Sequence, residues 1–76
     1  MNKASDPLLE LLDEDDMALP PKTILINFKR KLSDPPSRST LFRAIEDLEE
    51  NGYIERYPTA ETHYDITDTG RKYLRG

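Results

Sequence analysis

The longest regular pattern of apolar positions in the chain lies within residues 37–52. Its apolar residues recur at the spacing of one helix face: Leu41, Ala44, Ile45 and Leu48. Ser37 precedes the pattern and predicts the N-cap, because its hydroxyl can accept a hydrogen bond from a free amide of the first turn. Gly52 predicts the end of the helix, since glycine adopts the left-handed conformation without steric cost. We therefore predict a helix over residues 37–51.

A first helix is predicted near the start of the chain. It begins at Asp6-Pro7, where the carboxylate can cap free amides and proline occupies the first turn. It ends in the acidic run 13–16, because carboxylates are unfavourable at the negative end of the helix dipole. Its apolar residues are Leu8, Leu9, Leu11 and Leu12. Residues 1–5 before it are expected to form a flexible N-terminus, and the apolar residues 17–19 after it can form a single edge strand.

A second helix is predicted to begin at Pro20-Pro21, since proline lacks only an amide that the first turn leaves free. Its buried side is predicted from four apolar residues: Ile24, Leu25, Phe28 and Leu32. The bases 29–31 close it, where they complement the negative end of the dipole. Serine, aspartate and two prolines in 33–36 predict a turn. Helix, short turn and helix in this order is typical of a helix-turn-helix.

Two strand patterns follow Gly52. Residues 53–57 and 63–66 are rich in aromatic and β-branched side chains and flank the connection 58–62, which predicts a β-hairpin with a five-residue loop. In the second strand one face is expected to be buried and the other exposed, because Tyr64 and Ile66 alternate with His63 and Asp65.

A last short helix is predicted over residues 69–75, with Thr67 or Asp68 as its cap and Tyr73 and Leu74 as its anchors. The order of these elements predicts one α+β domain over residues 6–76. It would have a three-helix core, a two- or three-stranded β-sheet and a short C-terminal helix.

Charge is unevenly distributed along the 76 residues, whose net charge is -4. Residues 1–21 carry one base and six acids, residues 22–43 six bases and one acid, and residues 44–76 four bases and eight acids. The three segments therefore have net charges of -5, +5 and -4. A positive segment between two negative ones is typical of a binding face on a body that otherwise repels the same partner.

The helix predicted over residues 37–51 carries its charges in the order that opposes its dipole. Arg38 and Arg43 lie in its first two turns, and four carboxylates lie in its last two: Glu46, Asp47, Glu49 and Glu50. An external anion at the N-terminus would explain this order, and a DNA duplex entered N-terminus first supplies such anions. The pattern also fits a surface helix whose charges pair with neighbours, so both interpretations stay open at this point.

Composition excludes several classes of protein. The absence of cysteine excludes disulfides, thiolate zinc sites and cysteine nucleophiles. No apolar run approaches the ~20 residues that span a bilayer, so we expect a cytoplasmic location and no membrane partner. The acidic run 13–16 lacks the glycine-centred loop that a calcium site needs, and we expect no metal and no cofactor.

No arrangement of residues predicts catalysis. A serine nucleophile needs a base within reach, and the single histidine, His63, is expected on an exposed strand. Glu49 and Glu50 are adjacent and diverge by about 100° on a helix, so they cannot act as a carboxylate pair. Three scattered glycines are too few for a phosphate-binding loop. We expect no enzyme, no catalytic residue and no small-molecule substrate.

Taken together, these elements resemble the winged helix-turn-helix transcription regulators. Residues 39–43 with 48–55 resemble the recognition helix and first wing strand of the multiple-antibiotic-resistance-regulator and PadR-like groups. Residues 64–74 resemble the second wing strand and the tyrosine, threonine, glycine-arginine segment that follows it. Residues 19–22 (Leu-Pro-Pro-Lys) and the acidic composition most resemble small haloarchaeal proteins similar to the phage phi-H repressor, which suggests a halophilic source. The resemblance covers residues 6–75.

The resemblance implies a transcription regulator, expected to be a repressor, that binds double-stranded DNA sequence-specifically and acts as a homodimer. The third helix would read the major groove, and the wing would lie along the adjacent backbone or minor groove. Carried over by position, ten residues would face DNA: Ser37, Arg38, Ser39, Thr40 and Arg43 in the helix, Lys29 and Arg30 before it, and Thr59, Thr62 and His63 in the wing. Arg38 and Arg43 are the candidates for guanine recognition, worth about 1–3 kcal/mol of discrimination for a good bidentate contact.

The chain departs from the family pattern in three respects. The wing tip, residues 58–62, is short and contains an acid, Glu61, where lysine or arginine would strengthen DNA binding. The long flanking helices that many relatives use for dimerisation are missing. Phe42 can either pack into the core or lie against the groove. The acidic body also suits an alternative function, a winged-helix module that binds protein, or an antitoxin-like module, without specific DNA binding.

Overall fold

The protein is described by a computed structural model that covers residues 2–76, apart from the side chain of Glu61. The expected α+β class is confirmed, with four helices and one two-stranded antiparallel sheet in the described residues. The elements in chain order are α1 (Ser5–Asp15), α2 (Pro21–Lys31), α3 (Arg38–Glu50), β1 (Ile54–Tyr57), β2 (Ala60–Ile66) and α4 (Asp68–Arg75). None of these helices is long and apolar enough to cross a membrane.

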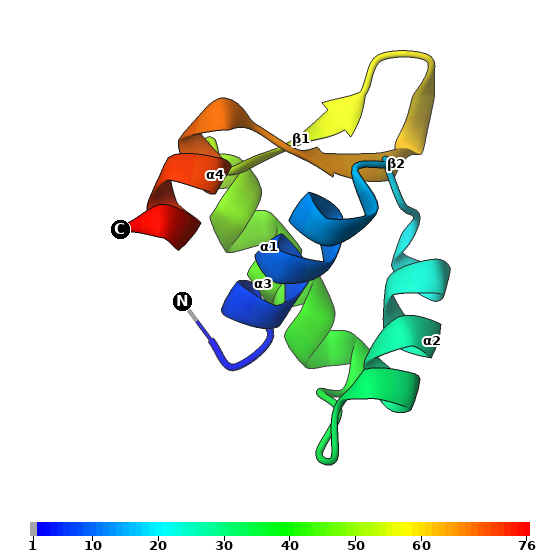
Figure 1. The fold of residues 1–76 in the computed structure, drawn as a ribbon. Coiled ribbons are helices and arrows are strands. Elements are labelled where there is room, and N and C mark those ends of the chain that lie inside the picture. Colours follow the sequence, from blue (N-terminus) through cyan, green and yellow to red (C-terminus); the bar gives the residue numbers. More distant parts are fainter. Residues whose placement is uncertain (1) are drawn as a thin grey trace.

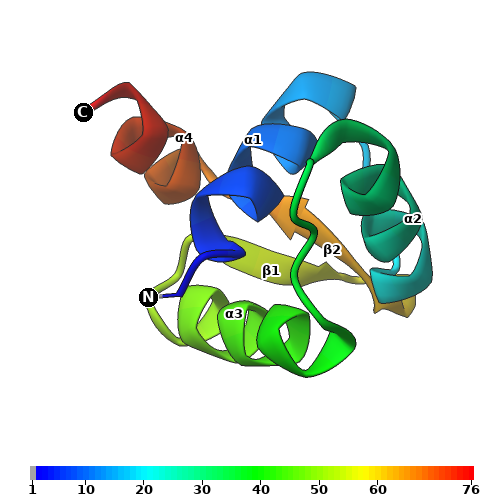
Figure 2. The ribbon, with the colours of Figure 1, turned by 90° about the horizontal axis from the view of Figure 1, so that it is seen from below.

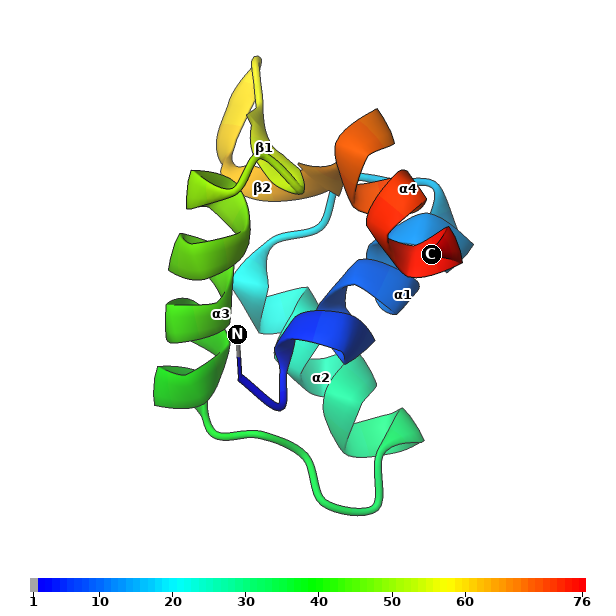
Figure 3. The same cartoon turned by 90° about the vertical axis from the view of Figure 1, so that its left-hand side faces the viewer.

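Helix α1 is the centre of the molecule. It packs against α2, α3, α4 and β2, and the hairpin of β1 and β2 closes one end of the helical layer (Figure 1). The four apolar residues predicted for its buried side are all buried: Leu8, Leu9, Leu11 and Leu12. Seen from the side, α3 and α4 lie on opposite flanks of α1 (Figure 3). The core therefore forms around one short leucine-rich helix.

The start of α1 differs from the prediction. Ala4, not Asp6, is the N-cap residue, and no side chain caps the helix there. Ala4 and Ser5 are buried, and the Asn2 side-chain amide donates a 2.9 Å hydrogen bond to the Thr40 carbonyl of α3. Ala4 and Ser5 therefore belong to the folded domain and not to the flexible N-terminus expected from the sequence, while Met1 lies outside the described residues.

Helices α2 and α3 begin and end close to the predicted positions. Pro21 occupies the first turn of α2. Ser37 caps α3, where its Oγ accepts a 3.1 Å hydrogen bond from the Thr40 amide. Gly52 follows the helix in the left-handed conformation, with φ of 75°. The apolar stripe of α3 is buried as predicted: Leu41, Ala44, Ile45 and Leu48. In Figure 2 the connection between α2 and α3 crosses in front of the core, and both helices flank the sheet.

The hairpin has a shorter loop than predicted. Strand β2 begins at Ala60, so Pro58 and Thr59 alone connect the strands, and the expected five-residue loop 58–62 is wrong. The register runs from Ile54 opposite Ile66 to Arg56 opposite Tyr64, and an irregularity follows before Tyr57 pairs with Ala60. Residues 60–62, predicted to lie in the loop, belong to the irregular part of β2, because Thr62 and its neighbours can continue an extended backbone.

Residues 17–19 do not form a strand. Leu19 alone bridges β2: its amide donates a 2.8 Å hydrogen bond to the Tyr64 carbonyl, and its carbonyl accepts a 2.9 Å hydrogen bond from the Tyr64 amide. The prolines that follow cannot donate the hydrogen bonds that would extend the pairing. This bridge fixes the start of α2 against the hairpin.

Helix α4 is fixed to the start of the hairpin. Thr67 caps it, as one of the two predicted candidates, since its Oγ1 accepts from the Gly70 amide at 3.0 Å and donates to the Gly52 carbonyl at 2.6 Å. Gly70 is buried against the backbone of Tyr53, where a side-chain Cβ would overlap the Tyr53 carbonyl oxygen. The ring of Tyr73 stacks on Tyr53 with centroids 4.9 Å apart.

Candidate nucleic-acid interface

The first turns of α3 present polar and basic side chains to solvent. Ser37, Arg38, Ser39 and Arg43 are exposed, and Thr40 is half-buried. The Ser37 hydroxyl also donates to the Thr40 hydroxyl at 3.0 Å, so both hydroxyls are ordered beside the end of the helix. Neither arginine turns toward the core. A free helix N-terminus with two outward arginines can bind an anion, because amides, hydroxyls and guanidinium groups converge on it.

Phe42 lies outside the core and beneath Arg38. Its side chain remains 39% exposed, and the Arg38 guanidinium carbon lies 5.2 Å from the centre of its ring. This distance is within the range of a cation–π contact. Of the two placements that the sequence left open for Phe42, the structure has the one on the surface of α3.

Helix α2 contributes a basic groove next to this end of α3. The groove has a volume of about 500 Å³ and is lined by Pro21, Lys22, Leu25, Ile26, Lys29 and Arg38. It holds three cations and no carboxylate, and its exposed apolar residue, Ile26, is 49% exposed. Arg30 is exposed nearby on α2 but does not line the groove. Such a groove can hold anionic oxygens, those of phosphate groups among them.

Lys22 and Ile26 were missed by the sequence reasoning. Together with Lys29 they recur four and three positions apart on α2, which places them on one face of that helix. The signal for these residues lies in the periodicity of α2, whose exposed face carries them opposite the buried Ile24 and Phe28.

Ion pairing divides the basic residues into two sets. Five are paired with carboxylates: Lys3 with Asp34 at 3.4 Å, Lys31 with Glu14 at 3.3 Å, Arg56 with Glu49 at 3.0 Å, and Arg71 and Arg75 with Asp13 at 3.3 and 3.8 Å. Five bases on α2 and α3 have no carboxylate partner among the described residues, and we call them the open cluster: Lys22, Lys29, Arg30, Arg38 and Arg43. Lys72 on α4 is also unpaired there but lies on another element.

The positive surface ends within α3. Beyond Arg43 the solvent-facing residues are Glu46 and Glu50, and Glu49 is engaged by Arg56 of β1. A duplex would therefore meet attraction at the N-terminal half of the helix and repulsion at its C-terminal half. This distribution favours an anionic ligand that approaches α3 at its N-terminal end.

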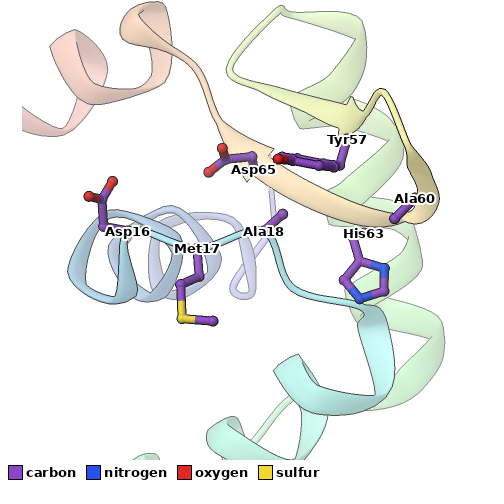
Figure 4. A pocket seen from close by; sticks show the side chains of 7 residues that line it. All are labelled: Asp16, Met17, Ala18, Tyr57, Ala60, His63 and Asp65. Atoms are coloured by element: carbon purple, nitrogen blue, oxygen red, sulfur yellow. The ribbon is translucent and has the colours of Figure 1, made fainter.

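The three predicted hairpin residues differ in their exposure to solvent. Thr59 and Thr62 are exposed near the hairpin turn. His63 is half-buried, and its Nδ1 lies 3.2 Å from Thr62 Oγ1. Figure 4 shows the His63 ring in a hollow between β2 and the connection from α1 to α2, which is lined by Asp16, Met17, Ala18, Tyr57, Ala60, His63 and Asp65. Because this hollow contains two carboxylates, it is a less favourable position for phosphate than the groove at α2.

In the part of the chain that the structure describes, no group of three or more His, Cys, Asp or Glu side chains could hold a metal ion. No protein-family model, curated protein or solved structure matches the chain. What the interface can bind therefore follows from its geometry and charge.

Proposed function

We propose that this chain is a winged helix-turn-helix protein that binds double-stranded DNA sequence-specifically and regulates transcription, as a repressor. In this proposal α2 and α3 form the helix-turn-helix and the β1–β2 hairpin forms the wing. The N-terminal half of α3 enters the major groove, where Arg38 and Arg43 reach base edges. Ser37, Lys22, Lys29 and Arg30 contact phosphates on the flank.

The observation that carries the proposal is the open cluster. Three of its cations, Lys22, Lys29 and Arg38, line one groove without a carboxylate and repel one another, which lowers the stability of the free domain. Acids are plentiful in this chain, with 15 Asp and Glu against 11 Lys and Arg, so partners for these bases would be easy to supply. An anionic partner explains why the cluster remains open, and a DNA duplex presents a dense array of anions, about one charge per 1.7 Å of its axis.

Two copies of the chain are proposed to bind paired half-sites about one helical turn apart. Sedimentation of the domain with and without a duplex tests this assembly. A complex that contains a single protein copy on every duplex would contradict it.

A salt titration tests the proposed function. The domain is added to a mixed-sequence duplex at increasing salt, and the affinity should fall with a log–log slope of about -2.7 for each bound chain if Lys22, Lys29 and Arg30 each neutralise one phosphate. Lys29→Ala should weaken binding to all duplexes alike and reduce the slope by about one. Arg43→Ala should reduce the preference for a selected sequence about 5- to 150-fold. Circular dichroism at each salt concentration, including high potassium, verifies that the acidic domain stays folded.

Arg75→Ala is the matched control, because Arg75 is an exposed arginine that pairs with Asp13 outside the open cluster. It should leave DNA affinity unchanged. Undetectable affinity at low salt for a folded domain, or equal losses from Arg43→Ala and Arg75→Ala, would favour the alternative of a protein-binding module.

A further inference from the structure

Phe42 is the part of the interface that phosphate binding does not explain. A single exposed apolar side chain is common on protein surfaces. Here, however, the ring supports the guanidinium of Arg38 at 5.2 Å from its centre, and Arg38 belongs to the open cluster at the reading end of α3. The ring also sits beside residues that are otherwise polar, since Ser39 and Arg43 share the exposed side of the helix. The pair therefore presents a cation and an apolar edge together.

The spacing of the two side chains limits what they can reach. Arg38 and Phe42 are four residues apart, so their side chains lie one above the other on one side of α3. One turn of an α-helix rises about 5.4 Å, whereas stacked bases are about 3.4 Å apart. Side chains in mutual contact at this spacing meet neighbouring base pairs and not distant ones.

Each member of the pair has one suitable partner in the major groove. The guanidinium only donates hydrogen bonds, so the O6 and N7 acceptors of guanine fit it best. The phenyl ring accepts no such bonds, and the one apolar group on the major-groove edge is the C5-methyl of thymine. We propose that Arg38 and Phe42 together recognise a T·A pair next to a G·C pair. This inference depends on the proposed DNA-binding function.

Base analogues test the inference directly. Duplexes are first selected from a random library with the wild-type domain. Each thymine of the selected site is then replaced by uracil, which lacks only the C5-methyl, and each guanine by 7-deazaguanine, which lacks the N7 acceptor. In each half-site one thymine beside one guanine should respond, and each uracil replacement there should weaken binding about three- to fivefold, as expected for loss of one buried methyl group.

Two substitutions of Phe42 separate the methyl contact from the support of Arg38. Phe42→Ala removes both, so the thymine-to-uracil ratio should fall to about one and the effect of 7-deazaguanine should shrink. Phe42→Leu keeps an apolar side chain but no ring, so it should retain the uracil effect and lose part of the 7-deazaguanine effect. Met17→Ala is the matched control, because Met17 is an apolar residue that is 61% exposed and lies outside the basic groove and outside α3, and it should change neither ratio.

The outcomes distinguish this inference from the proposed function. Selection of a site in which uracil is tolerated at every thymine overturns the inference and leaves DNA binding intact. The inference is also overturned if Phe42→Ala keeps the wild-type uracil effect in a domain whose melting temperature is unchanged. An unchanged 7-deazaguanine effect in Phe42→Leu would show that the two side chains act separately. Failure to enrich any sequence, together with no salt dependence, rejects the proposed function itself.

Discussion

Two groups of basic side chains in this protein occupy opposite electrostatic environments. On α4, Arg71 is 29% exposed and lies within 3.5 Å of carboxylates from Asp13, Asp16 and Asp68. On α2 and the first half of α3, the open cluster contacts no carboxylate of the described residues. The first group joins α4 to the end of α1, whereas the second forms no ion pair with any other element in the described residues.

The difference lies in how the acidic residues are placed. The acidic end of α1 faces α4, and the acids of α3 are confined to its last two turns, with Glu49 turned to Arg56. The basic residues of segment 22–43 therefore have few acidic neighbours, although the chain has more acidic than basic residues. At the α4 flank the basic side chains form ion pairs that stabilise the fold, whereas on α2 and α3 the basic side chains of the open cluster remain accessible to a ligand. Violations of local stability rules are expected at binding sites, and the open cluster is such a violation.

The largest expected effect comes from Gly70→Ala, which disrupts the packing of α4 against the start of the hairpin. A Cβ at Gly70 would overlap the Tyr53 carbonyl and contact the Ile66 side chain, so α4 would have to move. We expect the free energy of unfolding to fall by about 3 kcal/mol. Urea denaturation, with the midpoint compared at constant slope, measures this loss.

Gly52→Ala is the control for Gly70→Ala. Gly52 has φ of 75° but open space around its Cβ position. Only backbone strain applies there, which costs about 1 kcal/mol. Equal losses for the two variants would show that the close approach of α4 to Tyr53 contributes little.

A smaller effect is expected from Arg71→Ala, which should lower the free energy of unfolding by about 1 kcal/mol, since its ion pairs are partly exposed and screened by salt. DNA affinity should not change. A double-mutant cycle of Arg71→Ala with Asp13→Asn measures the pair itself.

Arg30→Ala should show the reverse, with unaltered stability and weaker binding, because Arg30 has no carboxylate partner among the described residues. Loss of stability in Arg30→Ala would remove the distinction between the two groups.

Much of the fold could be predicted from local sequence. The leucines of α1 and the stripe from Leu41 to Leu48 follow helical periodicity, and Ser37 and Thr67 are caps whose partners lie three residues away. The errors arise where distant contacts decide. Ala4 is buried because neighbouring elements pack over it, and the strand from Ala60 continues because its backbone pairs with Tyr57. No local sequence pattern predicts either of these two contacts.

The candidate site could be predicted in part. The exposure of Arg38 and Arg43 follows from the position of the apolar stripe on α3. The ion pairing of the bases cannot be predicted in the same way, because Lys31 meets Glu14 and Lys3 meets Asp34 only after the chain has folded. The groove at Lys22 and Ile26 likewise requires α3 to approach α2. Sequence therefore identified the positive segment but not which of its bases remain open.

The decrease in the free energy of unfolding at alkaline pH tests the contact between α1 and α4 alone. The Tyr73 hydroxyl donates a 3.0 Å hydrogen bond to Asp6, and this bond and the charge of that carboxylate raise the pKa of Tyr73 above its ordinary value of 10.0. The folded state holds the proton more tightly than the unfolded state, so this contribution is present below pH 10 and is lost as pH rises through the raised pKa. Tyr73→Phe should remove this alkaline loss, whereas Tyr57→Phe, at an exposed tyrosine of β1, should retain it. Chemical denaturation between about pH 8 and pH 12 at constant ionic strength, a range of about two units on either side of the ordinary tyrosine pKa, measures the difference.

The smallest expected change in stability has the opposite sign and tests the open cluster most directly. Ser39 is exposed in the first turn of α3, where a carboxylate would interact favourably with the free amides of the helix and with Arg43 one turn later. Ser39→Glu should therefore raise the free energy of unfolding by about 0.5 kcal/mol. The same carboxylate would stand where DNA phosphates and base edges are proposed to approach, so duplex binding should be lost. Ser39→Gln, of the same length without the charge, should show neither the gain in stability nor the full loss of binding. A domain that becomes both more stable and unable to bind DNA would show that the positive end of α3 is kept free of acids for its ligand; unchanged binding by Ser39→Glu would mean that the duplex does not meet this end of the helix.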